Sequence, residues 1–178
     1  MTIGLSLTDT YRSLTGSEDP SKIAAFKRLF IERADEVMVG LAEIFPEVGP
    51  TLASLRGFGL RLGIVSTKNR YMIEGILRRY ELASSFDLIL GREDVLRSKP
   101  DPEGILLALA LLSEPPTEVL YVGDSLIDAE VAKRTGLAFV AVLSGTTTAE
   151  EFTPYGPQGV LRRLDELPSW LVARGSTG

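Results

Sequence analysis

Apolar positions recur at helical spacing through the N-terminal quarter of the chain. In residues 20–45, apolar side chains return every three or four positions with charged residues between them, which predicts one long amphipathic helix. Before it, residues 6–20 predict a short helix that is capped by Thr8 and ends near Gly16. We therefore expect this part of the chain to be helical.

After Pro46 the pattern changes to short apolar runs that alternate with amphipathic stretches. Strands are predicted for the apolar runs at 60–66, 86–90, 118–123 and 138–144. Helices are predicted at 49–59, 69–82, 101–112, 124–136 and 164–173. This alternation is typical of a parallel sheet covered by helices, so we expect a Rossmann-like α/β core over residues 46–178 and a separate helical part over 1–45. The polar, Gly- and Pro-rich stretch 144–159 is expected to be a surface connection.

Composition narrows the chemistry. The 178 residues include no cysteine and no histidine, and the formal net charge is −5. That charge argues against nucleic acid or an anionic membrane as a partner. Without thiols and imidazoles, carboxylates, lysines and hydroxyls remain for catalysis or binding, and such oxygen ligands suit Mg²⁺. No leader-like segment or long apolar run occurs, which predicts a cytoplasmic protein.

Polar residues follow three of the predicted strands, where open parallel sheets bind their ligands. The first strand ends in "IVSTKN", which places Ser66, Thr67 and Lys68 ahead of a helix. A hydroxyl and the backbone N–H groups at a helix N-terminus can hold a phosphate. The alternative is that Ser66 or Thr67 only caps the helix.

The second group lies in "RSKPDPEG", ahead of another helix. Asp101 and Pro102 are explained by the helix start itself. Lys99 stands apart only by its position, and a solvated surface lysine is the simpler interpretation of that residue taken alone.

The third group is "VGDSLIDAEVAKRTG", in which Asp124 follows a buried strand and Asp128 lies one helical turn later. Ser125 and Asp128 have the spacing of a capping box, which would explain Asp128 structurally. Asp124 has no such explanation, and its carboxylate should point into the crevice at the sheet edge. Two acids this close remain ionised together only beside a cation or a lysine, and Mg²⁺ with a phosphate is one solution.

The order and spacing of these three motifs resemble the haloacid dehalogenase (HAD) superfamily of phosphohydrolases. "IVSTK", "SKPDP" and "VGDSLIDAEVAKRTG" match its second, third and fourth motifs, and residues 45–145 most resemble the phosphoglycolate phosphatase and β-phosphoglucomutase-like group. The resemblance implies Mg²⁺-dependent hydrolysis of a small phosphorylated metabolite. Ser66 and Lys99 would act on the phosphoryl group, Asp124 would bind Mg²⁺, and Asp128 would assist the metal site.

The first motif of that family, an apolar strand followed by Asp-x-Asp-x-Thr, has no match in the sequence. Asp9 is the nearest candidate, but it fits the first turn of a helix better. The resemblance implies that residues 1–45 are the later part of a helical cap. It also implies that the strand of the first motif lies between the strands that end at Ser66 and Gly123. We therefore expect a gap in the sheet and an inactive chain.

Three alternatives belong to other classes of protein. A non-catalytic phosphate- or metal-binding module could form a homodimer through an open sheet edge. A dinucleotide-binding domain is disfavoured because the glycines of "RGFGLRLG" precede a strand and do not follow one. A response-regulator receiver domain needs an early aspartate pair, which the sequence lacks.

Overall fold

The computed structural model describes residues 7–175, and of residues 34–36 only the backbone. The chain forms two compact units, Met1–Ala42 and Glu43–Gly178. No helix in the described part of the chain is long and apolar enough to cross a bilayer.

The first unit is a pair of helices, α1 (Leu7–Thr15) and α2 (Pro20–Leu41). α1 ends where Gly16 takes a left-handed conformation, with φ of +66°, as the sequence predicted. Thr8, however, lies inside α1 and does not cap it, and Ser6 of the predicted segment lies outside the described residues.

The start of α2 is fixed by local chemistry. The Asp19 side chain accepts hydrogen bonds from the backbone N–H groups of Ser21 and Lys22, and Pro20 occupies the first turn. The helix ends at Leu41 and not at Phe45, because Ala42 leaves the helical conformation with ψ of 129°.

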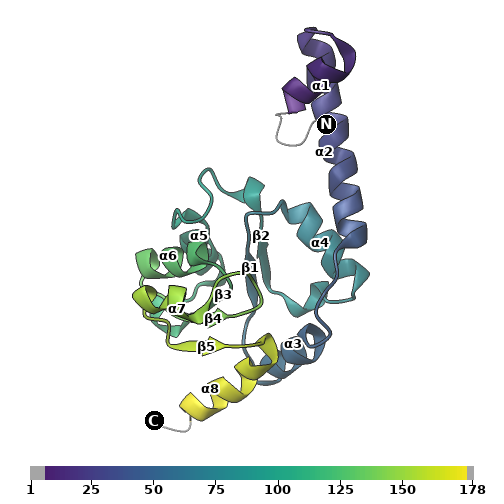
Figure 1. The fold of residues 1–178 in the computed structure, drawn as a ribbon. Helices are drawn as coiled ribbons and strands as arrows, with labels where there is room; N and C mark the ends of the chain where they lie inside the picture. Colours follow the sequence, from purple (N-terminus) through teal and green to yellow (C-terminus); the bar gives the residue numbers. More distant parts are fainter. Residues whose placement is uncertain (1–6, 176–178) are drawn as a thin grey trace. The chain divides into compact units, whose positions relative to one another are not determined.

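The described part of the second unit is built on five parallel strands in two sheets (Figure 1). One sheet pairs β1 with β2 and the other has the order β3-β4-β5. In register, Val65 lies opposite Leu90, and Gly123 lies opposite Ala141. The strand bounds are β1 Gly63–Val65, β2 Leu88–Leu90, β3 Leu120–Gly123, β4 Ala138–Val142 and β5 Gly159–Leu161.

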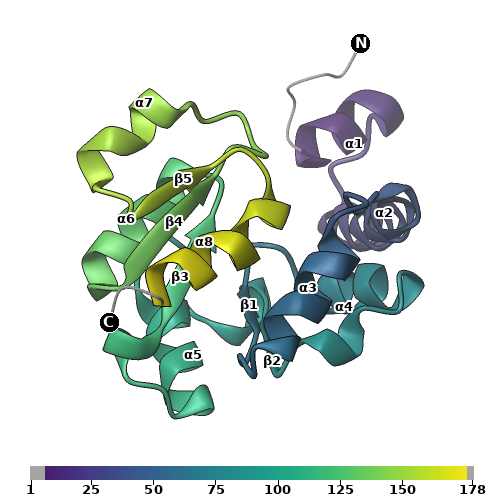
Figure 2. The same cartoon turned by 90° about the horizontal axis from the view of Figure 1, so that it is seen from below.

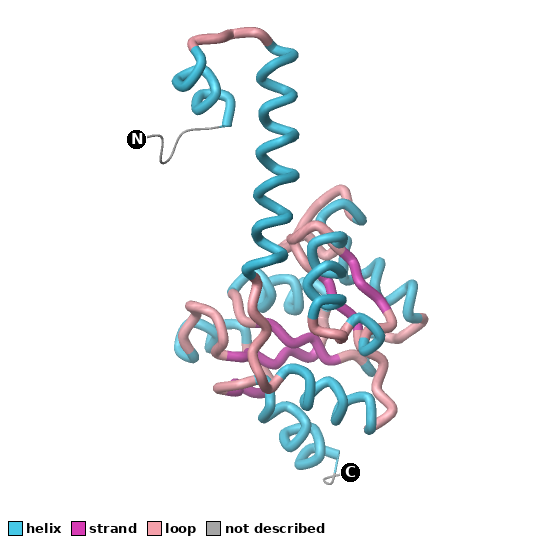
Figure 3. The backbone as a smooth tube through the Cα atoms, turned by 90° about the vertical axis from the view of Figure 1, so that its right-hand side faces the viewer, coloured by secondary structure: helices cyan, strands magenta, loops and turns pink. Residues whose placement is uncertain are grey.

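In the described residues of this unit, six α-helices accompany these strands, and Figure 3 shows helices around the strands. The helix bounds are α3 Val48–Gly57, α4 Arg70–Arg79, α5 Glu103–Leu112, α6 Leu126–Thr135, α7 Ala149–Phe152 and α8 Leu167–Gly175. Short 3-10 turns lie at Ala83–Ser85 (η1), Arg92–Asp94 (η2), Pro116–Glu118 (η3), Thr153–Tyr155 (η4) and Leu164–Glu166 (η5). The predicted strands and helices are confirmed, mostly with shorter ends, although α3 begins one residue earlier and α8 ends two residues later than predicted. The α/β class with its parallel strands is as expected.

The stretch 144–159 is more structured than the sequence predicted. It contains α7 and η4, and it leads into β5, which pairs with β4. Most of the stretch is exposed and it connects β4 to β5, so the predicted surface connection is confirmed, but it is not a loop throughout. β5 has only three residues and follows Pro157, so neither its length nor its neighbours produce a recognisable strand pattern.

Side chains alternate along β4 and place helices on both faces of its sheet. Val140 and Val142 pack in a cluster with residues of α3 and α8, whereas Phe139 and Ala141 pack against residues of α6 and α7. This is the layered arrangement of an α/β core.

The two sheets do not join among the strands that the structure describes. β1 and β3 both have described neighbours on one side only, β2 and β4 respectively. Val65 of β1 and Tyr121 of β3 nevertheless pack on one apolar cluster, formed by buried residues of α5 and α6 and by Leu137. Figures 1 and 2 show β1 and β2 apart from β4 and β5. Among the described strands, the sheet is therefore interrupted between β1 and β3, at the place where the gap was predicted.

Candidate active site

The end of β3 and the start of α6 form a tightly bonded turn. The Ser125 hydroxyl accepts a hydrogen bond from the Asp128 N–H (3.3 Å), and the Asp128 carboxylate accepts one from the Ser125 N–H (3.2 Å). The capping box predicted from the sequence is therefore present. Gly123 is needed for it, since a Cβ at that position would lie 2.4 Å from the Asp128 Cβ.

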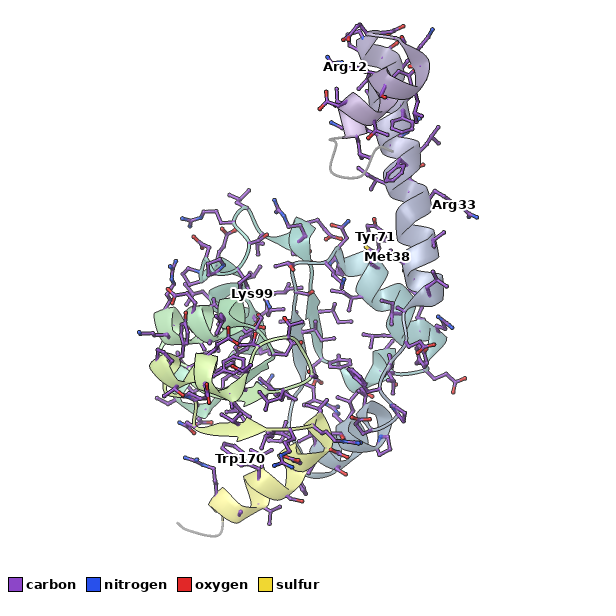
Figure 4. All side chains as sticks on the ribbon, in the orientation of Figure 1. Arg12, Arg33, Met38, Tyr71, Lys99 and Trp170 are labelled. Atoms are coloured by element: carbon purple, nitrogen blue, oxygen red, sulfur yellow. The ribbon has the colours of Figure 1, made fainter. Side chains whose placement is uncertain are left out.

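Asp128 is also the centre of a buried polar network. Lys99 Nζ donates to Asp128 Oδ1 at 2.7 Å, and the Tyr121 hydroxyl donates to the same oxygen at 2.9 Å. Only 13% of the Lys99 side chain and 9% of the Asp128 side chain are exposed. The interpretation of Lys99 as a solvated surface lysine was therefore wrong. Figure 4 labels Lys99 on the segment ahead of α5.

The charges of this network are set by burial and by hydrogen bonds. Burial by itself would raise the pKa of Asp128, but hydrogen bonds from Lys99 and Ser125 and the charge of Lys99 outweigh it and lower the pKa. Burial, and then the negative charge of Asp128, raise the pKa of the Tyr121 hydroxyl. Asp128 is therefore a carboxylate at neutral pH, and Tyr121 is a protonated donor.

All acceptor positions of Asp128 are in use. A carboxylate offers about four lone-pair sites. Lys99 and Tyr121 occupy two of them at Oδ1, and the N–H and hydroxyl of Ser125 occupy two at Oδ2. Asp128 as it stands therefore has no free lone pair for a metal ion, and its assistance to a metal site stays a prediction.

Asp124 has the opposite surroundings. Its side chain is exposed, and in the described part of the chain no donor is found on its carboxylate. The loop after β4 passes close by, since a Cβ on Gly145 would lie 2.8 Å from Asp124 Oδ2. A free carboxylate suits Mg²⁺, which takes one or two carboxylates together with phosphate and water. Asp124 fits as a direct ligand, although no cluster of three or more acidic residues exists among the described side chains.

The end of β1 is arranged differently. The Ser66 hydroxyl accepts a hydrogen bond from the Lys68 N–H at 3.1 Å, and the Thr67 and Lys68 side chains are exposed. The cap of α4 is Asn69, which makes no side-chain capping bond. Capping by Ser66 or Thr67 was therefore the wrong alternative. The structure does not by itself test phosphate binding by Ser66, Thr67 and Lys68, which stays a prediction.

The first backbone N–H group of α4 donates to a side chain from another segment. Both carboxylate oxygens of Glu93, in η2, lie 2.9 Å from the Arg70 N–H. A phosphate cradle at the end of β1 would therefore use the loop 66–69 and not this first helical N–H. Glu93, Tyr121 and Gly145 were all missed from the sequence. Only Tyr121 carried a signal, since strand alternation turns it toward the side of the sheet where α6 holds Asp128.

Comparison with known proteins gives the family. The model of the haloacid dehalogenase-like hydrolases matches residues 1–142. A pyrophosphatase PpaX of Bacillus mycoides is 33% identical over 93% of this chain and 75% of its own length. A phosphoglycolate phosphatase of Salmonella paratyphi A is 30% identical over 82% of this chain and 58% of its own length. The chain thus spans less than two thirds of that phosphoglycolate phosphatase.

Solved structures agree. A protein of Bacteroides fragilis assigned as a haloacid dehalogenase-like hydrolase is 42% identical, with a TM-score of 0.76 over 93% of this chain and 79% of its own. CbbY of Rhodobacter sphaeroides, solved in complex with phosphate, is 28% identical, with a TM-score of 0.70 over 85% of this chain and 67% of its own. The chain belongs to the haloacid dehalogenase-like hydrolases, in their phosphoglycolate phosphatase-like group.

Proposed function

We propose that this chain supplies the phosphate- and Mg²⁺-binding part of a phosphatase that acts on a small phosphorylated metabolite. The observation that carries the proposal is the contrast between the two acids of the β3–α6 turn. Asp128 is buried and holds the Lys99 ammonium group at 2.7 Å, while Asp124 is exposed and free to take a cation. A fixed lysine beside a metal-binding carboxylate is suited to a dianionic phosphate group.

Each residue would have a distinct task. Asp124 would hold Mg²⁺, which when bound neutralises charge on the phosphate oxygens. Lys99, held by Asp128, would donate a hydrogen bond to a phosphate oxygen and offset its charge. Ser66 would donate its hydroxyl proton to another oxygen, and its present bond from the Lys68 N–H leaves that proton available. CbbY, a 28% identical neighbour, was solved with phosphate bound.

Hydrolysis would need one further group. The covalent nucleophile of the family is the first aspartate of Asp-x-Asp-x-Thr, and the sequence contains no such motif. In the family this motif follows a strand that would lie between β1 and β3, where the two sheets do not join. Ser98 Oγ, next to Lys99, is the one buried side-chain oxygen in the described residues that has no partner. We propose that the chain alone binds phosphate without turnover.

The test compares the chain with and without an N-terminal extension that carries an apolar strand and Asp-x-Asp-x-Thr. The chain alone should bind inorganic phosphate in the presence of Mg²⁺ by calorimetry and should not hydrolyse p-nitrophenyl phosphate. The extended chain should hydrolyse it with Mg²⁺. A matched extension with asparagine for the first aspartate should be inactive.

Two results would contradict the proposal. One is Mg²⁺-dependent hydrolysis by the chain alone that disappears in Asp124→Ala. The other is a chain that binds no phosphate and gains no activity with the extension. If phosphate binds but the extension restores nothing, a non-catalytic phosphate-binding module becomes the better interpretation, and the absent motif is the observation that favours it.

A further inference from the structure

The Tyr121 hydroxyl joins the two charged groups of the buried network. It accepts a hydrogen bond from Lys99 Nζ at 3.0 Å and donates one to Asp128 Oδ1 at 2.9 Å. Lys99 Nζ and Asp128 Oδ1 are themselves 2.7 Å apart. The three polar atoms therefore form a closed triangle, and the hydroxyl uses its single proton and one lone pair in it.

This triangle restricts the lysine more than an ion pair does. One hydrogen bond to Asp128 would leave the ammonium group free to swing about that contact, because a lysine side chain has many rotamers. A second bond, to Tyr121 on the rigid strand β3, fixes its direction. Of the three N–H donors of Lys99, two then have partners in the protein, and one is left for a ligand.

We infer that Tyr121 is a positioning residue that aims the third Lys99 N–H bond at the phosphate group. The inference rests on the proposed function, since it needs phosphate to bind beside Lys99. Tyr121 does not itself touch the phosphate in this arrangement. Its effect passes through the lysine and should vanish when the lysine is removed.

The chain contains a matched control. Lys133 Nζ lies 5.8 Å from the Tyr155 ring centroid, as Lys99 Nζ lies 5.7 Å from that of Tyr121. Both tyrosines are half-buried. Among the described residues, however, no hydrogen bond to the Tyr155 hydroxyl is found. Tyr→Phe therefore removes the same atom at both positions and breaks the lysine hydrogen bond only at Tyr121.

The experiment measures inorganic phosphate binding with Mg²⁺ by calorimetry. Tyr121→Phe should raise the dissociation constant about 5- to 10-fold, the size expected for the loss of one ordinary intramolecular hydrogen bond. Tyr155→Phe should stay within about twofold. In a Lys99→Met background, which lacks the ammonium group, Tyr121→Phe should cause no further loss of phosphate affinity.

Three outcomes decide whether Tyr121 positions Lys99 or has only a structural role. Unchanged phosphate affinity in Tyr121→Phe, even with a lower melting temperature, would overturn the inference. An effect that persists in the Lys99→Met background would also overturn it. If the wild-type chain binds no phosphate, the proposed function fails, and the Lys99 ammonium signal in a ¹H–¹⁵N spectrum decides the role of Tyr121. That signal should shift or disappear in Tyr121→Phe and not in Tyr155→Phe. A signal that is unshifted in Tyr121→Phe would show that Tyr121 does not fix the position of the Lys99 ammonium group.

Discussion

The helices that follow β3 and β1 have their N-terminal backbone N–H groups capped in opposite ways. Each strand runs into a helix and leaves backbone N–H groups to be satisfied. At β3 the partner is local, because Ser125 and Asp128 cap α6 from within its own first turn. At β1 the partner is remote, because Glu93 reaches the Arg70 N–H from a segment 23 residues away. The locally capped end is also the buried one, where the carboxylate and the lysine are fixed.

This difference implies that the β3 end contributes more to stability than the β1 end. Replacing Asp128 should have the largest effect. Asp128→Asn leaves Lys99 buried without its counter-charge and turns an amide NH2 donor toward groups that are themselves donors, so the free energy of unfolding should fall by about 3 kcal/mol. Urea unfolding at pH 7 measures it. Asp165→Asn, on the surface, is the control and should change stability by less than about 0.5 kcal/mol. Equal effects would contradict the comparison.

In the wild-type chain, acid should remove the stabilisation that the ionised Asp128 carboxylate provides. The folded-state pKa of Asp128 is lowered, so its stabilisation is fully present above the ordinary carboxylate pKa of about 3.9 and is lost as pH falls through the lower folded pKa. The stability difference between wild type and Asp128→Asn should thus be constant from about pH 7 to 5 and shrink below about pH 4. Urea unfolding at each pH measures it. A difference that grows in acid would show that the assigned pKa direction is wrong.

A smaller loss of stability is expected when a side chain is added at Gly123, which lies close to the Asp128 side chain. Gly123→Ala places a Cβ 2.4 Å from the Asp128 Cβ, and the turn must shift at a cost of about 2 kcal/mol. Gly57→Ala is the matched control, because nothing lies within 4 Å of a Cβ there, and it should not destabilise the chain. Thermal unfolding of both variants compares them. A neutral Gly123→Ala would mean that the capping turn is less rigid than its bonds indicate.

The same local and remote contrast explains what the sequence could predict. The capping box was predictable because Ser125 and Asp128 are three positions apart and follow a known spacing. The alternating strands and helices were predictable from periodicity. The sheet gap followed from the family resemblance.

Other features depend on contacts that no spacing rule describes. Glu93 meets the start of α4 because β1 and β2 lie paired side by side and end next to each other. Lys99 looked like a surface lysine until the fold brought it to Asp128, 29 residues later. β5 was missed because three residues carry too little pattern. Sequence reasoning therefore named Lys99 and Asp128 but not the contact between them, and it missed Tyr121 and Glu93.

The smallest loss of stability should come from replacing Glu93, the remote cap of α4. Glu93→Ala removes the acceptor for the Arg70 N–H and should lower the free energy of unfolding by about 1 kcal/mol, as the loss of a helix cap does. Glu93→Gln keeps an acceptor oxygen and loses only the charge at the helix N-terminus, so its effect should be smaller. The sharper measurement is local. Amide exchange of Arg70 should speed up in Glu93→Ala, while amides near Ser125 keep their protection, because the two ends share no capping group. If both ends lost protection together, the two strand ends would unfold as one cooperative unit, and the remote cap would matter as much to the lysine site as the local one does.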